Sequence, residues 1–194
     1  MVEIVEYQEN WPHDFQLLAS ALRQALGDLA VRIDHIGSTS VPGLAAKDRI
    51  DMQLTVASFD DFAPIEAALA TLGYTVRSDV RRDHNPDHSQ TDAGTDPQWA
   101  KRLCTAPAGQ RPTNLHIRVN GRLNQRYPLL FRDYLRQHPP TAHTYAALKR
   151  QLAHYLPDNL HAYADIKDPA CDLIMQLAEK WAAETGWQPG KSGA

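Results

Sequence analysis

The chain has 194 residues, of which 43% are hydrophobic and 22% charged, and its formal net charge is -3. These values are ordinary for one globular domain with a sizeable core, and they exclude a chain that is disordered throughout. The small negative charge argues against a protein that binds nucleic acid through its overall charge. Two cysteines, Cys104 and Cys171, are too few for a disulfide framework.

The first residues and the hydrophobic runs indicate where the protein works. Glu3 and Glu6 stand where a signal peptide needs a basic residue before an apolar run. No apolar segment approaches the roughly 18 residues that a membrane-spanning helix requires. We therefore expect a soluble, cytoplasmic protein without a membrane partner.

Strands and helices alternate in the first 120 residues. Asn10 and Pro12 mark a helix start, and Gly27 marks its end. The expected elements are, in chain order, a weak edge strand at 2–7, a helix at 10–26, strands at 31–36 and 49–56, a helix at 60–72, and strands at 74–76 and 114–120. This order predicts a mixed α/β core.

The remainder of the chain has helical periodicity, with aromatic and leucine residues as anchors. Helices are expected near 122–137, 141–156 and 158–185. In the absence of an internal repeat or a linker, we predict a single domain over 1–188. It comprises a core at 1–120 and a helical part at 121–187, followed by a disordered tail at 189–194.

Residues 78–98 differ in character, because polar and turn-forming residues crowd together there with almost no aliphatic ones. This composition predicts a mobile surface loop. Asp83, His84, Asp87 and His88 are close enough in sequence to suggest a zinc site. However, Pro86 prevents the helix that would align the two histidines, so we favour a solvated loop.

The predicted strands at 49–56 and 114–120 each alternate apolar and polar residues, which gives each strand one polar face. These polar faces carry Asp51, Gln53, His116 and Arg118. A solvated face would favour Thr, Lys and Glu instead, and the four groups present suit the floor of a ligand site. A structural polar face explains the pattern equally well.

A hydroxyl-rich turn, Gly37–Ser40, follows the strand at 31–36 and suits phosphate oxygens. The turn is not a Walker loop, since Leu44 stands where the phosphate-binding lysine is expected. A strand, a Gly-Ser turn, a short helix and a strand bearing an inward Asp follow the order of a polymerase-beta-like nucleotidyltransferase core. In such enzymes the turn holds a triphosphate, and carboxylates two residues apart hold two magnesium ions.

The run His35–Lys47, with Ile50 and Asp51 behind it, resembles the signature of the GrpB family. Further stretches are similar to that family over nearly the whole chain, including Asn114–Val119, Leu129–Leu135 and Tyr145–Arg150. Around Trp99–Leu103 and Arg111–Asn114, the chain looks closest to the GrpB domain fused behind dephospho-coenzyme A kinase in some bacteria.

The resemblance implies an α/β (α+β) fold, with a nucleotidyltransferase (polymerase-beta-like) mixed-sheet core, a helical C-terminal half and a largely unassigned activity. We expect Asp51 and His116 to be catalytic and Asp51 to hold Mg²⁺. The candidate ligand- and phosphate-binding residues are Gly37, Ser38, Thr39, Ser40, Lys47, Gln53, Lys101, Arg102, Arg118, Lys149 and Lys167. Of these, Lys149 and Lys167 are favoured as residues at the rim of the pocket because of the resemblance to the family. Their spacing from Tyr145 and Tyr163 by itself favours surface packing, and Lys101 and Arg102 are equally well explained as surface charges.

The sequence departs from a working nucleotidyltransferase at the metal-binding carboxylates. Gln53 stands where a second acid is usual, and the later strand offers His116 and Arg118 in place of a third. Asp48 cannot substitute, because its odd offset from Asp51 puts it on the opposite strand face. Two hypotheses remain, and whether the protein is an enzyme stays open. One is a pocket for a nucleotide or coenzyme-phosphate ligand, with or without Mg²⁺-dependent transfer, and the other is a non-catalytic interaction or chaperone-like module linked to coenzyme A biosynthesis through a protein partner.

Overall fold

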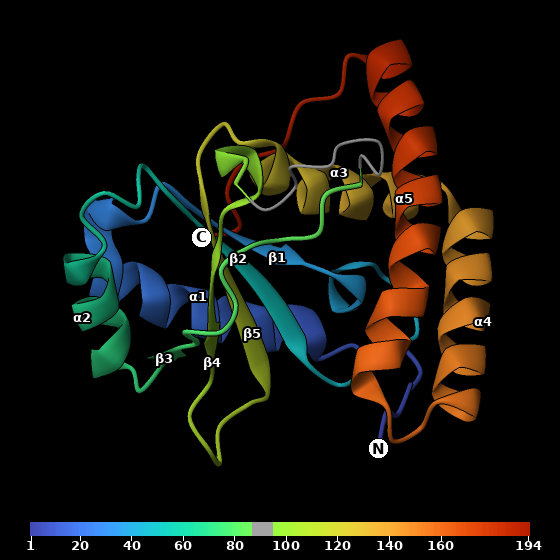
Figure 1. Ribbon diagram of the computed structural model, residues 1–194, viewed down its shortest axis with the longest axis horizontal. Helices are drawn as coiled ribbons and strands as arrows, with labels where there is room; N and C mark the ends of the chain where they lie inside the picture. Colours follow the sequence, from blue (N-terminus) through green and yellow to red (C-terminus); the bar gives the residue numbers. More distant parts are fainter. Residues whose placement is uncertain (87–94) are drawn as a thin grey trace.

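The structure is a computed structural model that describes residues 1–86 and 95–194 (Figure 1). Its elements are α1 (Trp11–Leu26), β1 (Arg32–Ile36), β2 (Ile50–Val56), α2 (Ala63–Thr71), β3 (Thr75–Val76), β4 (Arg102–Thr105), β5 (Thr113–Val119), α3 (Leu123–Gln137), α4 (Pro139–Tyr155) and α5 (Leu160–Thr185). The predicted α/β class with a helical C-terminal half is confirmed. β4 was not predicted from the sequence, and the expected edge strand at 2–7 is reduced to one bridge between Val5 and Ala46.

The sheet is five-stranded and mixed, in the order β1-β2-β5-β4-β3. β2 and β5 lie parallel at its centre, and the other neighbouring strands pair antiparallel. The register places Asp51 opposite Asn114 and Gln53 opposite His116. The two polar faces predicted from alternation therefore lie side by side on one face of the sheet.

The apolar face of the sheet packs against the first two helices. Met52, Leu54 and Ile117 are fully buried there, in one cluster with Phe15 and Leu22 of α1. Successive side chains along a strand point to opposite faces of the sheet, so this burial fixes which residues face the other way.

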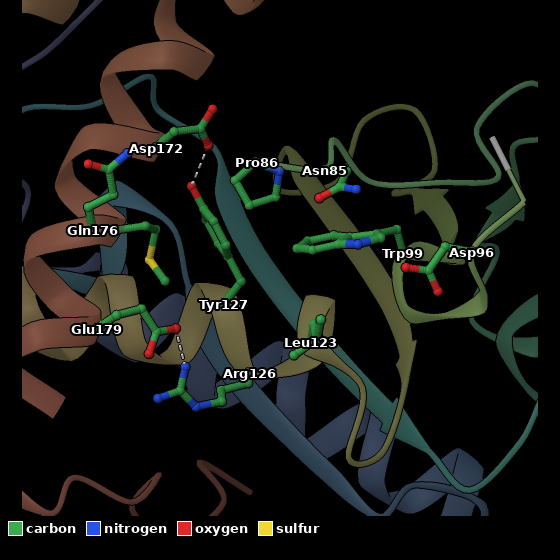
Figure 2. Close-up of a pocket in the computed structure, with 11 residues that line it drawn as sticks. Asn85, Pro86, Asp96, Trp99, Leu123, Arg126, Tyr127, Asp172, Gln176 and Glu179 are labelled. Carbon is green, nitrogen blue, oxygen red and sulfur yellow. Dashed lines mark hydrogen bonds and ion pairs between the residues drawn. The ribbon is translucent and has the colours of Figure 1, made fainter. Parts of the chain in front are cut away.

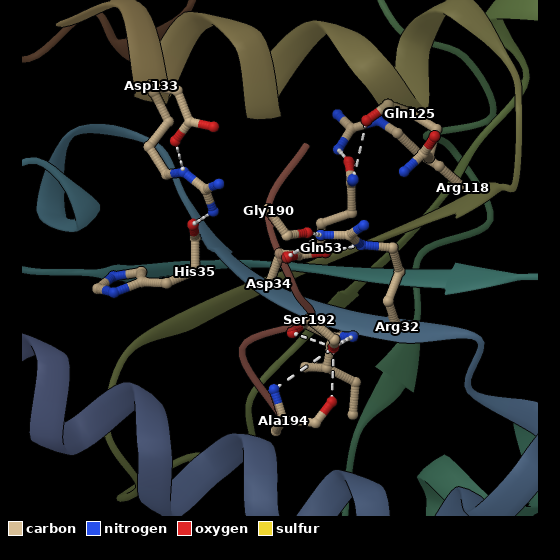
Figure 3. Close-up of polar contacts among 12 residues, drawn as sticks. Arg32, Asp34, His35, Gln53, Arg118, Gln125, Asp133, Gly190, Ser192 and Ala194 are labelled. Carbon is tan, nitrogen blue, oxygen red and sulfur yellow. Dashed lines mark hydrogen bonds and ion pairs between the residues drawn. The ribbon is translucent and has the colours of Figure 1, made fainter. Parts of the chain in front are cut away.

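The polar face is covered by α3 and is not a solvated surface. Gln53 is fully buried and donates from Nε2 to the Gln125 carbonyl of α3, 2.9 Å away (Figure 3). The long helix α5 packs against both α3 and α4, and Figure 1 shows α4 and α5 side by side at one end of the sheet. The site residues on the strands are therefore enclosed between the sheet and the helical half.

Two segments expected to be loose make defined contacts. Of the segment 78–98, residues 87–94 lie outside the described part of the chain, and so do Asp87 and His88 of the suggested zinc site. Within the same segment, Asp83 is largely buried among cations. The tail expected to be disordered lies along β1: Gly193 donates from its backbone N–H to the Ile33 carbonyl, 2.9 Å away. Arg32 also donates from Nη2 to the Gly190 carbonyl at 2.9 Å (Figure 3).

In the described ranges, no helix is both long and apolar enough to span a membrane.

Candidate functional site

The turn after β1 brings backbone and hydroxyl groups to the start of β2. Gly37 has a φ of 68°, and a Cβ placed there would lie 2.6 Å from Asp51 Oδ2. Only glycine combines this left-handed backbone with so close an approach. Ser38–Ser40 then form a single 3-10 turn, so the predicted short helix exists in this reduced form.

A cavity of about 210 Å³ opens at this turn, and we call it the lysine cavity. It is lined by Gly37, Ser38, Thr39, Ala46, Lys47, Arg49, Asp51, Asn114, Tyr145, Lys149, Tyr163 and Lys167. Seven of the candidate residues are among these twelve, and they come from the turn, the segment before β2, β2, α4 and α5. Four of the described lining residues are cations, and one is an acid.

Lys149 is the most deeply buried cation of the lysine cavity, with 3% of its surface exposed. Its Nζ donates to Ser38 Oγ at 2.7 Å and to the Ala45 carbonyl at 2.6 Å, and it lies 4.6 Å from the centre of the Tyr145 ring. Burial lowers the pKa of Lys149 to about 7. The spacing of Lys149 from Tyr145 predicted that both pack on the surface. This prediction is wrong, because α4 packs onto the turn and buries the amine.

The other two lysines are held at the rim by aromatic and acidic neighbours. Lys47 Nζ lies 4.9 Å from the centre of the Tyr163 ring. Lys167 Nζ donates to Asp168 Oδ1 at 2.8 Å and to Cys171 Sγ at 3.4 Å. Burial lowers the pKa of Lys167, but Cys171 and Asp168 outweigh that effect and leave the pKa raised. Lys167 therefore stays charged at neutral pH.

Asp51 forms the acidic wall of the lysine cavity. Its Oδ1 accepts a hydrogen bond from Asn114 Nδ2 at 2.8 Å and lies 3.9 Å from His116 Nε2. Burial raises the pKa of Asp51, but His116, Asn114 and the charge of Lys47 together leave the pKa below its usual value. Burial also lowers the pKa of His116, which favours a neutral imidazole.

The donor set of the lysine cavity fits a resident magnesium ion poorly. Asp51 is the single carboxylate among its described lining residues, and one of its oxygens already accepts from Asn114. Within the described ranges, no group of three or more His, Cys, Asp or Glu is placed to hold a metal. Since Mg²⁺ prefers several oxygen ligands and Lys47, Lys149 and Lys167 repel a cation, this chemistry suits an anion better.

Three other candidate residues belong to a separate charged group, which we call the Asp83 cluster. The carboxylate of Asp83 accepts from Lys101 Nζ at 2.7 Å, from Arg118 Nε and Nη2 at 2.8 and 2.9 Å, and from Asn124 Nδ2 at 3.0 Å. Arg118 also donates from Nη1 to Gln53 Oε1 at 2.8 Å (Figure 3). Burial raises the pKa of Asp83, but its cationic neighbours hold the pKa far below the usual range. Gln53, Lys101 and Arg118 therefore serve this cluster and do not line the lysine cavity.

The structure places two further candidates away from the lysine cavity. Ser40 donates from Oγ to the Gly37 carbonyl at 2.6 Å, which closes the turn from within. The guanidinium carbon of Arg102 lies 4.8 Å from the centre of the Phe59 ring, on a contact that involves no other candidate. Ser40 therefore shapes the turn, and Arg102 packs on an aromatic side chain.

Three residues that matter here, Asn114, Arg49 and Asp83, were not among the predicted site residues, although Asp83 was part of the suggested zinc site. Asn114 shares the strand face of His116 and is two residues from it, so the alternation could have identified it. Arg49 shares the face of Asp51 for the same reason, and it donates from Nη1 to Asn114 Oδ1 at 3.2 Å. Asp83 carried no comparable signal, because its pairing with Arg118 spans 35 residues through an irregular segment.

The mixed sheet, with a Gly-Ser turn at the end of β1 and an acid at the start of β2, defines an α/β protein with a nucleotidyltransferase-like core. A family model described as GrpB protein matches residues 1–177, and the chain belongs to the GrpB family. A solved structure of the conserved protein GrpB from Enterococcus faecalis superimposes with a TM-score of 0.73 at 31% identity, covering 92% of this chain and 98% of that one.

Curated relatives fall into two groups. A dephospho-CoA kinase of Mycolicibacterium paratuberculosis is 36% identical over 97% of this chain, which corresponds to 48% of that protein. The UPF0157 protein BH1888 of Halalkalibacterium halodurans is 33% identical over 91% of this chain and 82% of that protein. The chain thus spans about half the length of the dephospho-CoA kinases that it matches.

Proposed function

We propose that this protein binds a phosphate-bearing ligand, a nucleotide or a coenzyme phosphate, in the lysine cavity. The observation that carries the proposal is the excess of cations around the Gly37–Ser38 turn: Lys47, Arg49, Lys149 and Lys167 against Asp51 alone among the described lining residues. Positive charge gathered around a cavity attracts phosphate oxygens, and ammonium groups hold them through charge-assisted hydrogen bonds.

The donor set favours binding over nucleotidyl transfer. Two-metal transfer needs carboxylates that clamp both ions, and the fully buried Gln53 is committed to Arg118 and Gln125. His116 is the remaining candidate for proton transfer, at 3.9 Å from Asp51. We therefore infer a pocket that has kept its phosphate-binding turn and holds its ligand without a resident Mg²⁺.

Titration calorimetry with inorganic triphosphate, with EDTA in one arm and Mg²⁺ in the other, tests the proposal. Lys47→Met should weaken binding about tenfold, because a charge-assisted hydrogen bond contributes roughly 1.5–3 kcal/mol. Lys180→Met is the matched control, since Lys180 lies on the exposed surface of α5 beside Glu184. Asp51→Asn should strengthen binding in EDTA, because it removes the single negative charge among the described lining residues.

Two results would overturn this assignment. No heat of binding at millimolar triphosphate in either arm would remove the phosphate pocket. Binding that requires Mg²⁺ and disappears in Asp51→Asn would instead make Asp51 a metal ligand, as the sequence comparison with nucleotidyltransferases suggested.

A second candidate function rests on the relatives. Because the chain spans about half the length of proteins named dephospho-CoA kinase, we propose as an alternative that it acts on such a kinase as a separate chain. Mixing it with the dephospho-CoA kinase of the same genome should then raise the melting temperature or the activity of that kinase. Unchanged values at a molar excess of this chain would dismiss the alternative.

A further inference from the structure

The lysine cavity is the first of three neighbouring cavities that are linked by shared lining residues. A cavity of about 170 Å³ shares Lys167 with it, and is also lined by Asp83 and Arg118. A third cavity, of about 380 Å³, shares Trp99 and Tyr127 with the second. The three cavities therefore follow one another between the polar side of the sheet and the helical half, and we call this series the cavity path.

The far end of this path is an aromatic slot, formed by Trp99 and Tyr127 with Leu123, Pro86 and Met175. Figure 2 shows the Trp99 indole directed toward Tyr127 of α3, with Leu123 and Pro86 on opposite sides of the space between them. Flat aromatic side chains that face a cavity offer stacking surface to a planar ligand group.

The slot is built on a rigid support. Asp96 Oδ1 accepts from the backbone N–H of Gln98 at 2.9 Å, which fixes the turn that carries Trp99. Gln98 Oε1 in turn accepts from the backbone N–H of Leu123 at 3.1 Å, so the turn is tied to the start of α3. Trp99 and Tyr127 therefore keep their relative positions before a ligand arrives, which lowers the entropic cost of binding.

The polar groups around the slot have the opposite charge balance to the lysine cavity. Asp96, Asp172 and Glu179 line it, and Arg126, its one described cation, is already ion-paired with Glu179 (Figure 2). Tyr127 donates from its hydroxyl to Asp172 Oδ1 at 3.4 Å. This end repels phosphate and accepts an uncharged ring, whereas the lysine cavity attracts phosphate.

We propose that the ligand is a nucleotide bound along this path, with its phosphates in the lysine cavity and its base stacked in the aromatic slot. The proposal rests on the phosphate site of the proposed function and adds the chemical class and direction of its ligand. Lys167 lies between the two ends, since it lines both the lysine cavity and the cavity next to the slot. A ligand with a phosphate group at one end and a planar ring at the other matches both ends at once.

The test compares inorganic triphosphate with ATP by titration calorimetry in EDTA. Stacking of a base on aromatic side chains should make ATP bind about ten- to a hundredfold more tightly. Leu123→Trp fills the slot at an exposed position and should abolish that difference without changing triphosphate affinity. Leu177→Trp, also exposed but absent from the slot, is the matched control, and Trp99→Phe should keep most of the difference.

The outcomes separate the two proposals. Equal affinities for ATP and triphosphate, or an equal loss of both in Leu123→Trp, would overturn the slot and leave the phosphate site standing. If triphosphate does not bind, but ATP binds and Leu123→Trp abolishes that binding, the phosphate site is overturned and the slot stands.

Discussion

The lysine cavity and the Asp83 cluster are built from the same residue types but are balanced differently. In the Asp83 cluster, one carboxylate accepts four hydrogen bonds from Lys101, Arg118 and Asn124, so both cations contact a carboxylate within the protein. In the lysine cavity, by contrast, four cations surround one described acid and face open volume. Lys167 is ion-paired with Asp168, so the surplus that points to an external anion rests on Lys47, Arg49 and Lys149.

Removing the carboxylate of the Asp83 cluster should have the largest effect and tests the contrast most directly. Asp83→Asn leaves the largely buried Arg118 and Lys101 without a counter-charge, and it should reduce the free energy of unfolding by about 3–5 kcal/mol. Urea unfolding at pH 7 measures this change. In the parent protein, the lowered pKa of Asp83 places the same contribution above pH ~3.9 and removes it as the pH falls below that value.

Asp79→Asn is the matched control for that substitution. Asp79 pairs with Arg77 in the same stretch of chain, but both side chains are well exposed. Solvent screens such a pair, so its loss should leave the unfolding curve unchanged. Equal stability of Asp83→Asn and the parent would show that the Asp83 cluster is no more internally balanced than a surface pair.

The same contrast explains what could be predicted from the sequence. Alternation identified the face shared by Asp51, Gln53 and His116, because neighbours two apart on a strand point the same way. It could not separate Gln53, which is held under α3, from Asp51, which lines the lysine cavity. That distinction depends on Gln125 and Asp83, which lie 72 and 30 residues away in the chain and have no periodic relation to the strand.

The helical half shows a related limit. Its helices follow from apolar periodicity, and they begin and end within about two residues of the predicted positions. Whether Lys149 faces solvent or the Gly37–Ser38 turn depends on how α4 packs against the core, and periodicity carries no information on that packing. Only the resemblance to the GrpB family pointed to Lys149.

The next prediction tests the turn of the lysine cavity through two glycines with similar backbones. Gly37→Ala should cost about 2–4 kcal/mol of stability, because its Cβ would meet Asp51 Oδ2 at 2.6 Å on a left-handed backbone. Gly43→Ala has the same kind of backbone, at a φ of 76°, but meets nothing within 4 Å, and should cost about 1 kcal/mol. Chemical unfolding of both variants measures the difference, and equal costs would show that Asp51 is free to move away from the turn.

The smallest expected effect is a pH dependence of ligand affinity that belongs to Lys149. Burial lowers the pKa of its amine to about 7 in the free protein, and a phosphate anion nearby favours the charged form and raises that pKa. Since the pKa is higher in the complex, the contribution of Lys149 to affinity is fully present below pH 7 and is lost as the pH rises through the pKa of the complex. The dissociation constant of inorganic triphosphate should therefore rise several-fold between pH 7 and about 9, with proton uptake on binding near neutral pH.

Lys149→Met should flatten this profile, whereas Lys180→Met, on the exposed face of α5, should leave it unchanged. The pH dependence of the free energy of unfolding of the free protein is an independent test of the lowered pKa of Lys149. The unfolded chain binds the Lys149 proton up to pH ~10.4, but the folded chain releases it near pH 7, so the free energy of unfolding should rise with pH between these values. A parent protein whose triphosphate affinity and stability are both flat from pH 7 to 9 would mean that Lys149 is charged throughout. Its buried charge would then be balanced within the protein, as in the Asp83 cluster, and the contrast between the two sites would disappear at this residue.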